Sequence, residues 1–266
     1  MSNKLRRGAV IGDPVEHSKS PLIHNAAIKD LGLSAVFESV QVKRGEVETT
    51  LRRMESQNYF GVSVTVPHKL EALEVCDELS YVARSVGAVN CVSFYEGRLV
   101  GHNTDSEGFT LAAEAGGFSI EGAKVVILGA GGAARAVAHG LEAEGAQITV
   151  LARSPREVVW KNCQAFDEKT LGRELVDAQM VVDCTPTGLV ERGDEMLPAK
   201  VPLDLLPKTA VVASLVYHRE PELLVKAAAL NLETMNGKEM LFRQGALAFE
   251  IWFEEEPSLD AMRAAF

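Results

Sequence analysis

One short segment constrains the fold of this chain more than any other. Four apolar residues run together at Val125–Leu128, and a glycine-rich turn follows before the helix-forming run Ala133–Ala136. This order of strand, tight turn and helix is the context in which a G-x-G-x-x-G/A pattern indicates a dinucleotide site. Gly129 permits the turn, Gly131 lets a pyrophosphate approach the backbone, and Ala134 keeps the helix close to the strand. The phosphates are expected at the helix N-terminus, where free N–H groups and the helix dipole favour anions.

The second strand of such a fold decides between NAD and NADP. NAD-binding proteins place an acidic residue about 20 positions after the glycines, where it binds the ribose hydroxyls. Here the strand ends instead in Ala152, Arg153 and Ser154, with Arg156 close behind. Guanidinium groups pair well with a 2′-phosphate. The sequence therefore predicts NADP as the cofactor, and the alternative is that both arginines are ordinary solvated surface charges.

Length and composition fit a soluble globular protein of two domains or one large one. The chain has 266 residues, and a domain usually takes roughly 100–200. Its net charge of −10 argues against a nucleic-acid partner. No run reaches the ~20 apolar residues that span a bilayer, and the N-terminus lacks the apolar region of a signal peptide. The four cysteines have no zinc or C-x-x-C spacing, which indicates reduced thiols in a cytoplasmic protein without a metal.

Strand and helix signals alternate along the chain in two blocks. In the first block we expect strands at 8–12, 37–42 and 61–66, a hairpin of 89–94 with 98–101, and helices at 20–32, 45–57 and from Pro67 onward. In the second block we expect strands at 125–128, 148–151, 180–184 and 210–215, and a last helix from Lys238 through Trp252. Ser20 is expected to cap its helix with Pro21 at the first helical position. In the second block this alternation predicts a parallel sheet and hence an α/β fold.

Four polar segments each follow or end an expected strand of the first block. They are residues 12–21, 63–69, 87–90 and 101–105. Ligands of open α/β sheets bind at the carboxyl ends of the strands. These segments are therefore the predicted substrate site.

Taken together, the four segments resemble the shikimate dehydrogenase family. Further matches lie at residues 129–136, 184–188, 216–217 and 240–246. The resemblance covers nearly the whole chain in order. It implies a substrate-binding catalytic domain of residues 1–105 completed by 240–266, and an NADP-binding Rossmann domain of residues 106–239. It also implies reversible reduction of 3-dehydroshikimate to shikimate by NADPH, in the biosynthesis of chorismate and the aromatic amino acids.

By this resemblance, Lys69 and Asp105 are the catalytic acid–base pair. An ammonium beside the reacting carbonyl can stabilise the developing alkoxide and supply its proton, and a carboxylate can orient the ammonium. The alternatives are a surface lysine and an aspartate that only caps a helix. A lysine in the first turn of a helix is disfavoured by the dipole, so a purely structural role explains Lys69 poorly.

The resemblance assigns further side chains to the two ligands. The implied substrate contacts are Ser18, Ser20, Thr65, Asn90, Tyr217 and Gln244. The implied cofactor contacts are Gly129, Ala130, Gly131, Gly132, Ala133, Arg153, Ser154, Arg156, Thr185 and Gly237. Ser20 has a second interpretation as a helix cap, and Tyr217 as an ordinary aromatic core residue.

The chain departs from the usual family pattern in several places. The departures include Ser63, Ala152, Ser214 and Asn231. Most of them lie on the nucleotide side, where they bear on the adenosine and nicotinamide contacts. Two alternatives stay open: a paralogous dehydrogenase acting on quinate or an amino-shikimate, and a nucleotide-sensing protein without turnover. Both a monomer and a homodimer are compatible with the resemblance.

Overall fold

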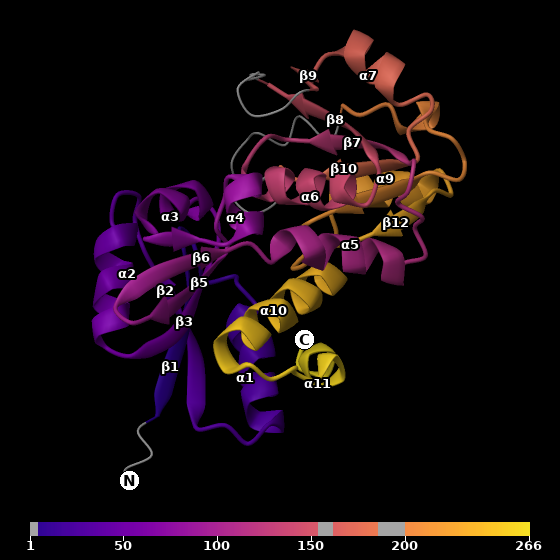
Figure 1. Cartoon of the computed structure of the whole chain (residues 1–266). Coiled ribbons are helices and arrows are strands. Elements are labelled where there is room, and N and C mark those ends of the chain that lie inside the picture. The colour runs from indigo at the N-terminus through magenta and orange to yellow at the C-terminus, as the bar shows by residue number, and fades with distance from the viewer. Residues whose placement is uncertain (1–4, 154–161, 186–199) are drawn as a thin grey trace. The chain divides into compact units, whose positions relative to one another are not determined.

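The computed structural model describes residues 5–153, 162–185 and 200–266 of the chain. The chain forms two units (Figure 1). Unit 1 consists of Met1–Gly108 and Leu241–Phe266, and unit 2 of Phe109–Met240. Within the described ranges each unit is built on a six-stranded sheet, and none of their helices has the length and apolarity needed to cross a membrane.

The sheet of unit 1 has the strand order β2-β1-β3-β5-β6-β4. Its strands are β1 (Arg6–Gly12), β2 (Ala35–Gln41), β3 (Tyr59–Val64), β4 (Glu78–Leu79), β5 (Cys91–Tyr95) and β6 (Arg98–His102). β1 is parallel to both β2 and β3, whereas β5 is antiparallel to β3 and β6. The expected hairpin is confirmed: Glu96 and Gly97 both have positive φ, 49° and 78°, as a tight two-residue turn requires.

Helices cover both faces of this sheet because apolar side chains alternate along its strands. The helices are α1 (Ser20–Asp30), α2 (Val47–Ser56), α3 (Lys69–Val75), α4 (Tyr81–Val86), α10 (Lys238–Phe253) and α11 (Leu259–Ala264). Ile11 and Val64 pack with Leu51 of α2 on one face. On the other face Phe37 stacks against Trp252 of α10, with ring centroids 5.6 Å apart.

The C-terminal segment is locked into unit 1 through a glycine of β3. A Cβ atom placed on Gly61 would lie 2.1 Å from Nε1 of Trp252. Only glycine therefore lets the indole approach this closely. The same Nε1 donates to the carbonyl oxygen of Val92 at 3.1 Å. The last helices thus pack onto the sheet formed by the first hundred residues.

Every pair of neighbouring strands in the sheet of unit 2 is parallel. The strands are β7 (Lys124–Leu128), β8 (Gln147–Ala152), β9 (Cys163–Ala165), β10 (Met180–Asp183), β11 (Val211–Ser214) and β12 (Glu233–Met235), in the order β12-β11-β10-β7-β8-β9. The expectation of a parallel, doubly wound sheet is confirmed. From β7 the chain adds strands first on one side and then on the other, so the topological switch point lies between β7 and β10.

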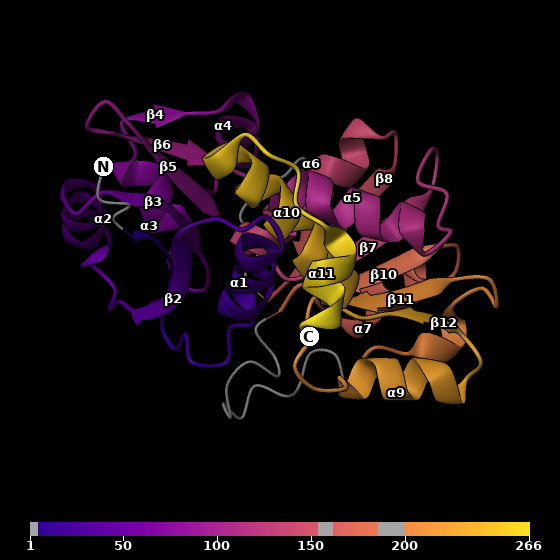
Figure 2. The same ribbon diagram turned by 90° about the horizontal axis from the view of Figure 1, so that it is seen from below.

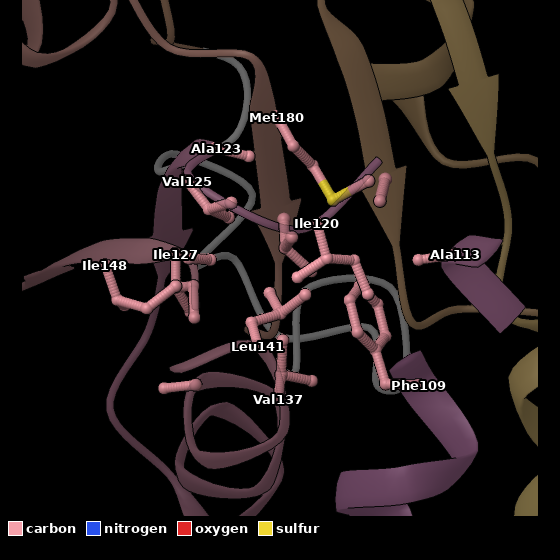
Figure 3. Packing of buried hydrophobic residues seen from close by; sticks show 14 of the residues in the cluster. Phe109, Ala113, Ile120, Ala123, Val125, Ile127, Val137, Leu141, Ile148 and Met180 are labelled. Atoms are coloured by element: carbon pink, nitrogen blue, oxygen red, sulfur yellow. The ribbon is translucent and has the colours of Figure 1, made fainter. Parts of the chain in front are cut away.

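Alternation along β7 builds two cores, one on each face of this sheet. The helices of unit 2 are α5 (Asp105–Ala115, shared with unit 1), α6 (Gly132–Ala143), α7 (Glu168–Glu174) and α9 (Glu222–Ala229), with a 3₁₀ turn at Leu203–Leu205. Ile127 packs with Leu141 of α6 and Phe109 of α5 (Figure 3). Leu128 points the other way and packs with Leu171 of α7. Helices accordingly lie on both faces of the sheet (Figure 2).

Two helix starts differ from the sequence-based expectation. Ser20 is the first residue of α1 and not its N-cap, which is Lys19 without a side-chain bond. The amides of Leu22 and Ile23, which a Ser20 cap would bind, donate instead to the carbonyl oxygen of Lys19, at 3.0 and 3.2 Å. The helix expected to begin at Pro67 begins at Lys69, because Thr65 to His68 form a turn in which the amide of His68 donates to the carbonyl of Thr65 at 2.9 Å.

His24 is a buried member of the aromatic core of unit 1. Its ring centroid lies 4.4 Å from that of Phe37 and 5.2 Å from that of Trp252. Neither ring nitrogen has a hydrogen-bond partner. Burial lowers the pKa of His24 from 6.5 to about 3. The folded protein therefore holds this imidazole in its neutral form.

We expect the free energy of unfolding to decrease as the pH is lowered, because of His24. Below pH 6.5 the imidazole of His24 binds a proton in the unfolded chain but not in the folded chain. The full stability of the fold is therefore present above pH 6.5, and part of it is lost as the pH falls toward about 3. The loss approaches ~1.4 kcal/mol per pH unit, or about 2 kcal/mol between pH 7 and pH 5. Urea unfolding of wild type and His24→Phe at both pH values measures it. The hypothesis fails if the two proteins lose the same stability on acidification.

Candidate functional site

Polar side chains of unit 1 follow the carboxyl ends of β1, β3 and β6. These three strands run in the same direction, so their ends share one edge of the sheet. Hydrogen bonds tie the edge together: the amide of Val64 donates to the carbonyl of Asn90 at 2.7 Å, and the amide of Asn90 to that of His102 at 3.1 Å. This is the edge at which α/β sheets bind ligands.

The structure brings Lys69 and Asp105 together in an ion pair. Lys69 is the first residue of α3 and Asp105 the first of α5. Both side chains are largely buried, with exposed fractions of 13% and 6%. The carbonyl of Lys69 also accepts from the amide of Val89 at 2.9 Å. A cation in the first turn of a helix is unfavourable, and the carboxylate of Asp105 offsets that cost. The pair thus presents an ammonium whose direction is set by a buried partner.

Two asparagines shape the loop that carries Asp105. Asn90 donates through Nδ2 to Oγ1 of Thr104 at 2.9 Å and accepts the Thr104 amide through Oδ1 at 2.7 Å. Asn103 donates to the carbonyl of Ala88 at 2.9 Å and accepts the amide of Ser106 at 3.2 Å. Asn103 and Thr104 lie in a predicted substrate segment, but the sequence alone assigned neither a role of its own. Their signal was a run of polar residues at a strand end, which does not distinguish loop anchors from ligand contacts.

Gln244 reaches this network from α10. Its Oε1 accepts from Nδ2 of Asn90 at 3.4 Å. A Cβ atom on Gly108 would lie 2.7 Å from Cβ of Gln244 and 2.8 Å from its backbone nitrogen, so α5 and α10 cross in close contact at this glycine. A Cβ atom on Gly245 would lie 2.7 Å from Cδ1 of Ile23. Close packing on both sides therefore places the Gln244 amide beside Asn90.

The remaining predicted substrate residues of unit 1 lie on neighbouring strand ends. Ser18 and Ser20 form a hydroxyl pair with oxygens 3.2 Å apart, at the start of α1. The amide of Thr65 donates to the carbonyl of Ile11 at 2.9 Å. A Cβ atom on Gly12 would lie 2.6 Å from Cγ2 of Thr65, so the ends of β1 and β3 are packed closely. These hydroxyl groups stand on the same edge of the sheet as Lys69.

In unit 2 the predicted nucleotide turn has the expected geometry. Gly129 has a φ of 101°, which favours glycine, and its amide donates to the carbonyl of Leu151 at 2.8 Å. Gly131 is the N-cap of α6 and is exposed, and a Cβ atom there would meet nothing within 4 Å. The turn continues through half-buried residues into the helix: Ala130, Gly132 and Ala133. An open N-terminus of this kind fits the pyrophosphate of a dinucleotide.

Asp183 and Thr185 lie beside this turn at the end of β10. The Oδ1 atom of Asp183 accepts from the amide of Thr185 at 3.0 Å and from its hydroxyl at 2.6 Å. Burial raises the pKa of Asp183, and the two bonds from Thr185 act in the opposite direction. A Cβ atom on Gly129 would lie 3.4 Å from Cγ2 of Thr185. Sequence reasoning missed Asp183, although an acid that ends an apolar strand was a visible signal.

The other predicted residues of unit 2 lie along the same carboxyl edge or outside the described residues. Arg153 follows β8 and is exposed. Ser154 and Arg156 lie outside the described residues. Tyr217 follows β11, half-buried, with its ring edge-on to His218. Gly237 follows β12, where a Cβ atom would lie 2.1 Å from the carbonyl oxygen of Leu215. Across the described ranges, no three His, Cys, Asp or Glu side chains form a group that could hold a metal.

Family models match most of the chain. Residues 10–92 match the shikimate dehydrogenase substrate binding domain, and residues 237–265 match the shikimate 5′-dehydrogenase C-terminal domain. Residues 118–192 match a model described as NAD(P)-binding.

Whole proteins of known identity are similar over nearly the full length. A shikimate dehydrogenase (NADP(+)) of Methanopyrus kandleri is 41% identical, over 96% of this chain and 93% of its own. The crystal structure of shikimate dehydrogenase from Aquifex aeolicus matches with a TM-score of 0.89 and 30% identity, covering 100% of this chain and 98% of that chain. The shikimate 5-dehydrogenase of Thermus thermophilus, solved in complex with NADP(H) and shikimate, matches at 0.86 and 34%, covering 98% of both chains.

Asp183 generates a prediction that depends on its buried charge. Because burial raises its pKa, the ionised carboxylate destabilises the fold, and the effect grows as pH rises past the ordinary carboxyl range. Asp183→Asn keeps an oxygen for both Thr185 bonds and removes the charge. We expect it to raise the free energy of unfolding at pH 7 by on the order of 1 kcal/mol, and by less at pH 4. Asp183→Ala, which removes the acceptor, serves as control and is expected to lower stability.

Proposed function

Because this chain belongs to the shikimate dehydrogenase family, we propose that it catalyses the NADPH-dependent, reversible reduction of 3-dehydroshikimate to shikimate. In this proposal unit 1 binds the substrate and unit 2 binds NADP, in the cytoplasm, on the route to chorismate and the aromatic amino acids. The observation that carries the proposal is the Lys69–Asp105 ion pair, which stands on the ligand-binding edge of the sheet among hydroxyl and amide side chains.

Lys69 is the acid–base group in this mechanism. The bound cofactor supplies or accepts the hydride at the carbon that bears the reacting oxygen. During reduction the Lys69 ammonium stabilises negative charge on that oxygen and gives it a proton; in oxidation the amine takes the proton back. Asp105 holds the ammonium in place through their ion pair. Its own position is fixed by the Asn90–Thr104 bonds one residue earlier.

The other polar side chains of unit 1 are proposed to orient the substrate. Ser18 and Ser20 stand at the N-terminus of α1, where the dipole favours a carboxylate, and their hydroxyls donate to it. The amides of Asn90 and Gln244, together with Thr65, bind ring hydroxyls. Buried amides that pair with hydroxyls strongly reject analogues that lack them. Tyr217 of unit 2 is proposed as a further substrate contact.

The nucleotide turn is proposed to hold NADP. The backbone at Gly129–Ala133 and the free N–H groups of α6 receive the pyrophosphate. Arg153 pairs with the 2′-phosphate, together with Ser154 and Arg156. Thr185, whose hydroxyl is oriented by Asp183, is a further proposed cofactor contact. The last is Gly237, which packs closely against the carbonyl of Leu215.

Nicotinamide absorbance tests the proposed reaction directly. The purified protein receives shikimate and quinate, each with NADP and with NAD. We expect rapid reduction of the cofactor only with shikimate and NADP. Turnover of quinate, or use of NAD, would place the chain among the paralogous dehydrogenases. No turnover in any of the four mixtures would favour a nucleotide-sensing protein.

Substitution of the proposed acid–base pair tests its role. Lys69→Met keeps most of the length of the side chain and removes the ammonium group, and Asp105→Asn removes the orienting charge. We expect Lys69→Met to lower kcat by roughly 10²- to 10⁴-fold, and Asp105→Asn to lower it less, with small changes in KM. Steady-state kinetics measure both, and Lys29→Met, at an exposed lysine near the end of α1, serves as control. Loss of binding without selective loss of rate would reassign Lys69 to substrate positioning.

Substitution of Arg153 tests cofactor selection. A charge-assisted hydrogen bond contributes about 1.5–3 kcal/mol, which corresponds to roughly a ten- to hundredfold change in affinity. We expect Arg153→Gln to lower kcat/KM for NADP by that factor and to leave kcat/KM for NAD unchanged. The NAD assay controls for general damage to the fold. Equal losses with both cofactors would exclude a contact specific to the 2′-phosphate.

A further inference from the structure

His68, the residue immediately before Lys69, is completely buried and is held by three hydrogen bonds. Its backbone N–H donates to the carbonyl of Thr65 at 2.9 Å, and its carbonyl accepts from the amide of Ala72 at 2.8 Å. Its Nε2 lies 2.6 Å from the carbonyl oxygen of Val42. A carbonyl only accepts, so Nε2 carries the proton and donates. The residue that precedes the proposed acid–base lysine is thus fixed through both backbone and side chain.

The acceptor of this bond is itself rigidly placed. Val42 follows β2, and its side chain is buried in the core of unit 1. Its amide donates to the carbonyl of Gly12 at 3.1 Å. The imidazole therefore ties the start of α3 to the ends of β2 and β1.

Glu71 provides a second attachment of α3 to the same segment. Its Oε1 accepts the amides of Gly45 at 3.0 Å and of Val47 at 3.3 Å. Its other oxygen lies 3.7 Å from Nδ1 of His68, too far for a hydrogen bond, and Nδ1 has no hydrogen-bond partner. The two attachments are thus separate. His68, directly before Lys69, binds the end of β2, whereas Glu71, in the first turn of α3, binds the backbone at the start of α2.

The helix α3 needs such attachments to define its direction. It has seven residues, and helices this short have little stability of their own. Its first residue carries the ammonium, on a side chain with four rotatable bonds. A small rotation of the first turn moves the ammonium away from Asp105.

We propose that His68 is a positioning residue for the reaction. Its Nε2–H bond to Val42 holds the first turn of α3 so that the ammonium of Lys69 meets Asp105 and the reacting oxygen of the substrate. The proposal rests on the proposed function for the role of Lys69, and His68 itself touches neither substrate nor cofactor in it.

Three variants separate positioning from simple stabilisation. His68→Phe fills the same space without a donor, and His68→Gln restores an N–H near the position of Nε2. Glu71→Ala removes the second attachment and leaves the residue before Lys69 intact. We expect His68→Phe to lower kcat by roughly ten- to a hundredfold, as a misplacement near 1 Å does, with little change in KM. His68→Gln should recover most of this rate.

The Glu71 variant is the matched control. At a temperature where His68→Phe and Glu71→Ala are equally folded by circular dichroism, we expect Glu71→Ala to keep its kcat close to that of wild type. If both variants lose the same kcat at equal folded fractions, His68 acts through stability alone and the proposal is wrong. Failure of His68→Gln to exceed His68→Phe would also overturn it.

A readout without substrate separates this proposal from the proposed function. The rate at which an amine-acylating reagent modifies Lys69, followed by peptide mass spectrometry, reports whether the ammonium remains paired and covered. We expect faster modification in His68→Phe, and wild-type rates in His68→Gln and Glu71→Ala. If wild type fails to oxidise shikimate, the proposed function fails and this rate still decides the role of His68. An unchanged rate in His68→Phe would exclude positioning of Lys69.

Discussion

The largely buried ion pair of Lys69 and Asp105 is the interaction on which the arrangement of unit 1 depends. Removing two charges from water is costly, and attraction between them offsets that cost only where the geometry is good. Lys69 and Asp105 begin two different helices, so neither local sequence nor either helix alone brings them together. The edge of the sheet does so: Val89 binds the backbone of Lys69, and Asn90 binds Thr104, the neighbour of Asp105. An irregular loop network held by hydrogen bonds is the physical requirement for a pre-oriented ammonium.

Glycines also allow segments that are far apart in the chain to pack closely. Gly61 admits Trp252 against β3, and Gly108 admits the backbone of Gln244 against α5. Both contacts join Leu241–Phe266 to Met1–Gly108. In unit 2, Gly237 meets the carbonyl of Leu215 in the same manner. From Leu241 onward, helix α10 is therefore part of unit 1 through packing that a single methyl group would disturb.

Sequence reasoning succeeded where signals are local and failed where they are not. The apolar run before Gly129, the Glu96-Gly97 turn and the βαβ alternation each depend on a few adjacent residues, and all are confirmed. The short strands β4, β9 and β12 carry too few residues to show a period and were not predicted. The Ser20 cap was wrong because the amides of Leu22 and Ile23, which such a cap would bind, donate to the carbonyl of Lys19 instead. His68 was missed because its partner Val42 lies in a distant part of the chain. Asp183 is an exception, because it was missed although its partner Thr185 is only two residues away and its place at the end of an apolar strand was a visible signal.

The sequence by itself determined the fold class, the nucleotide turn and the resemblance that points to a reaction. Those properties follow from short-range periodicity, from glycine at a position of positive φ, and from the order of motifs along the chain. Tertiary structure decided how polar residues that are far apart in the chain meet. The ion pair joins positions 36 residues apart, and the Asn90–Gln244 contact joins positions 154 apart. Such contacts are created when parallel strands align their ends and helices cross at glycines, and no local pattern encodes the separation between partners.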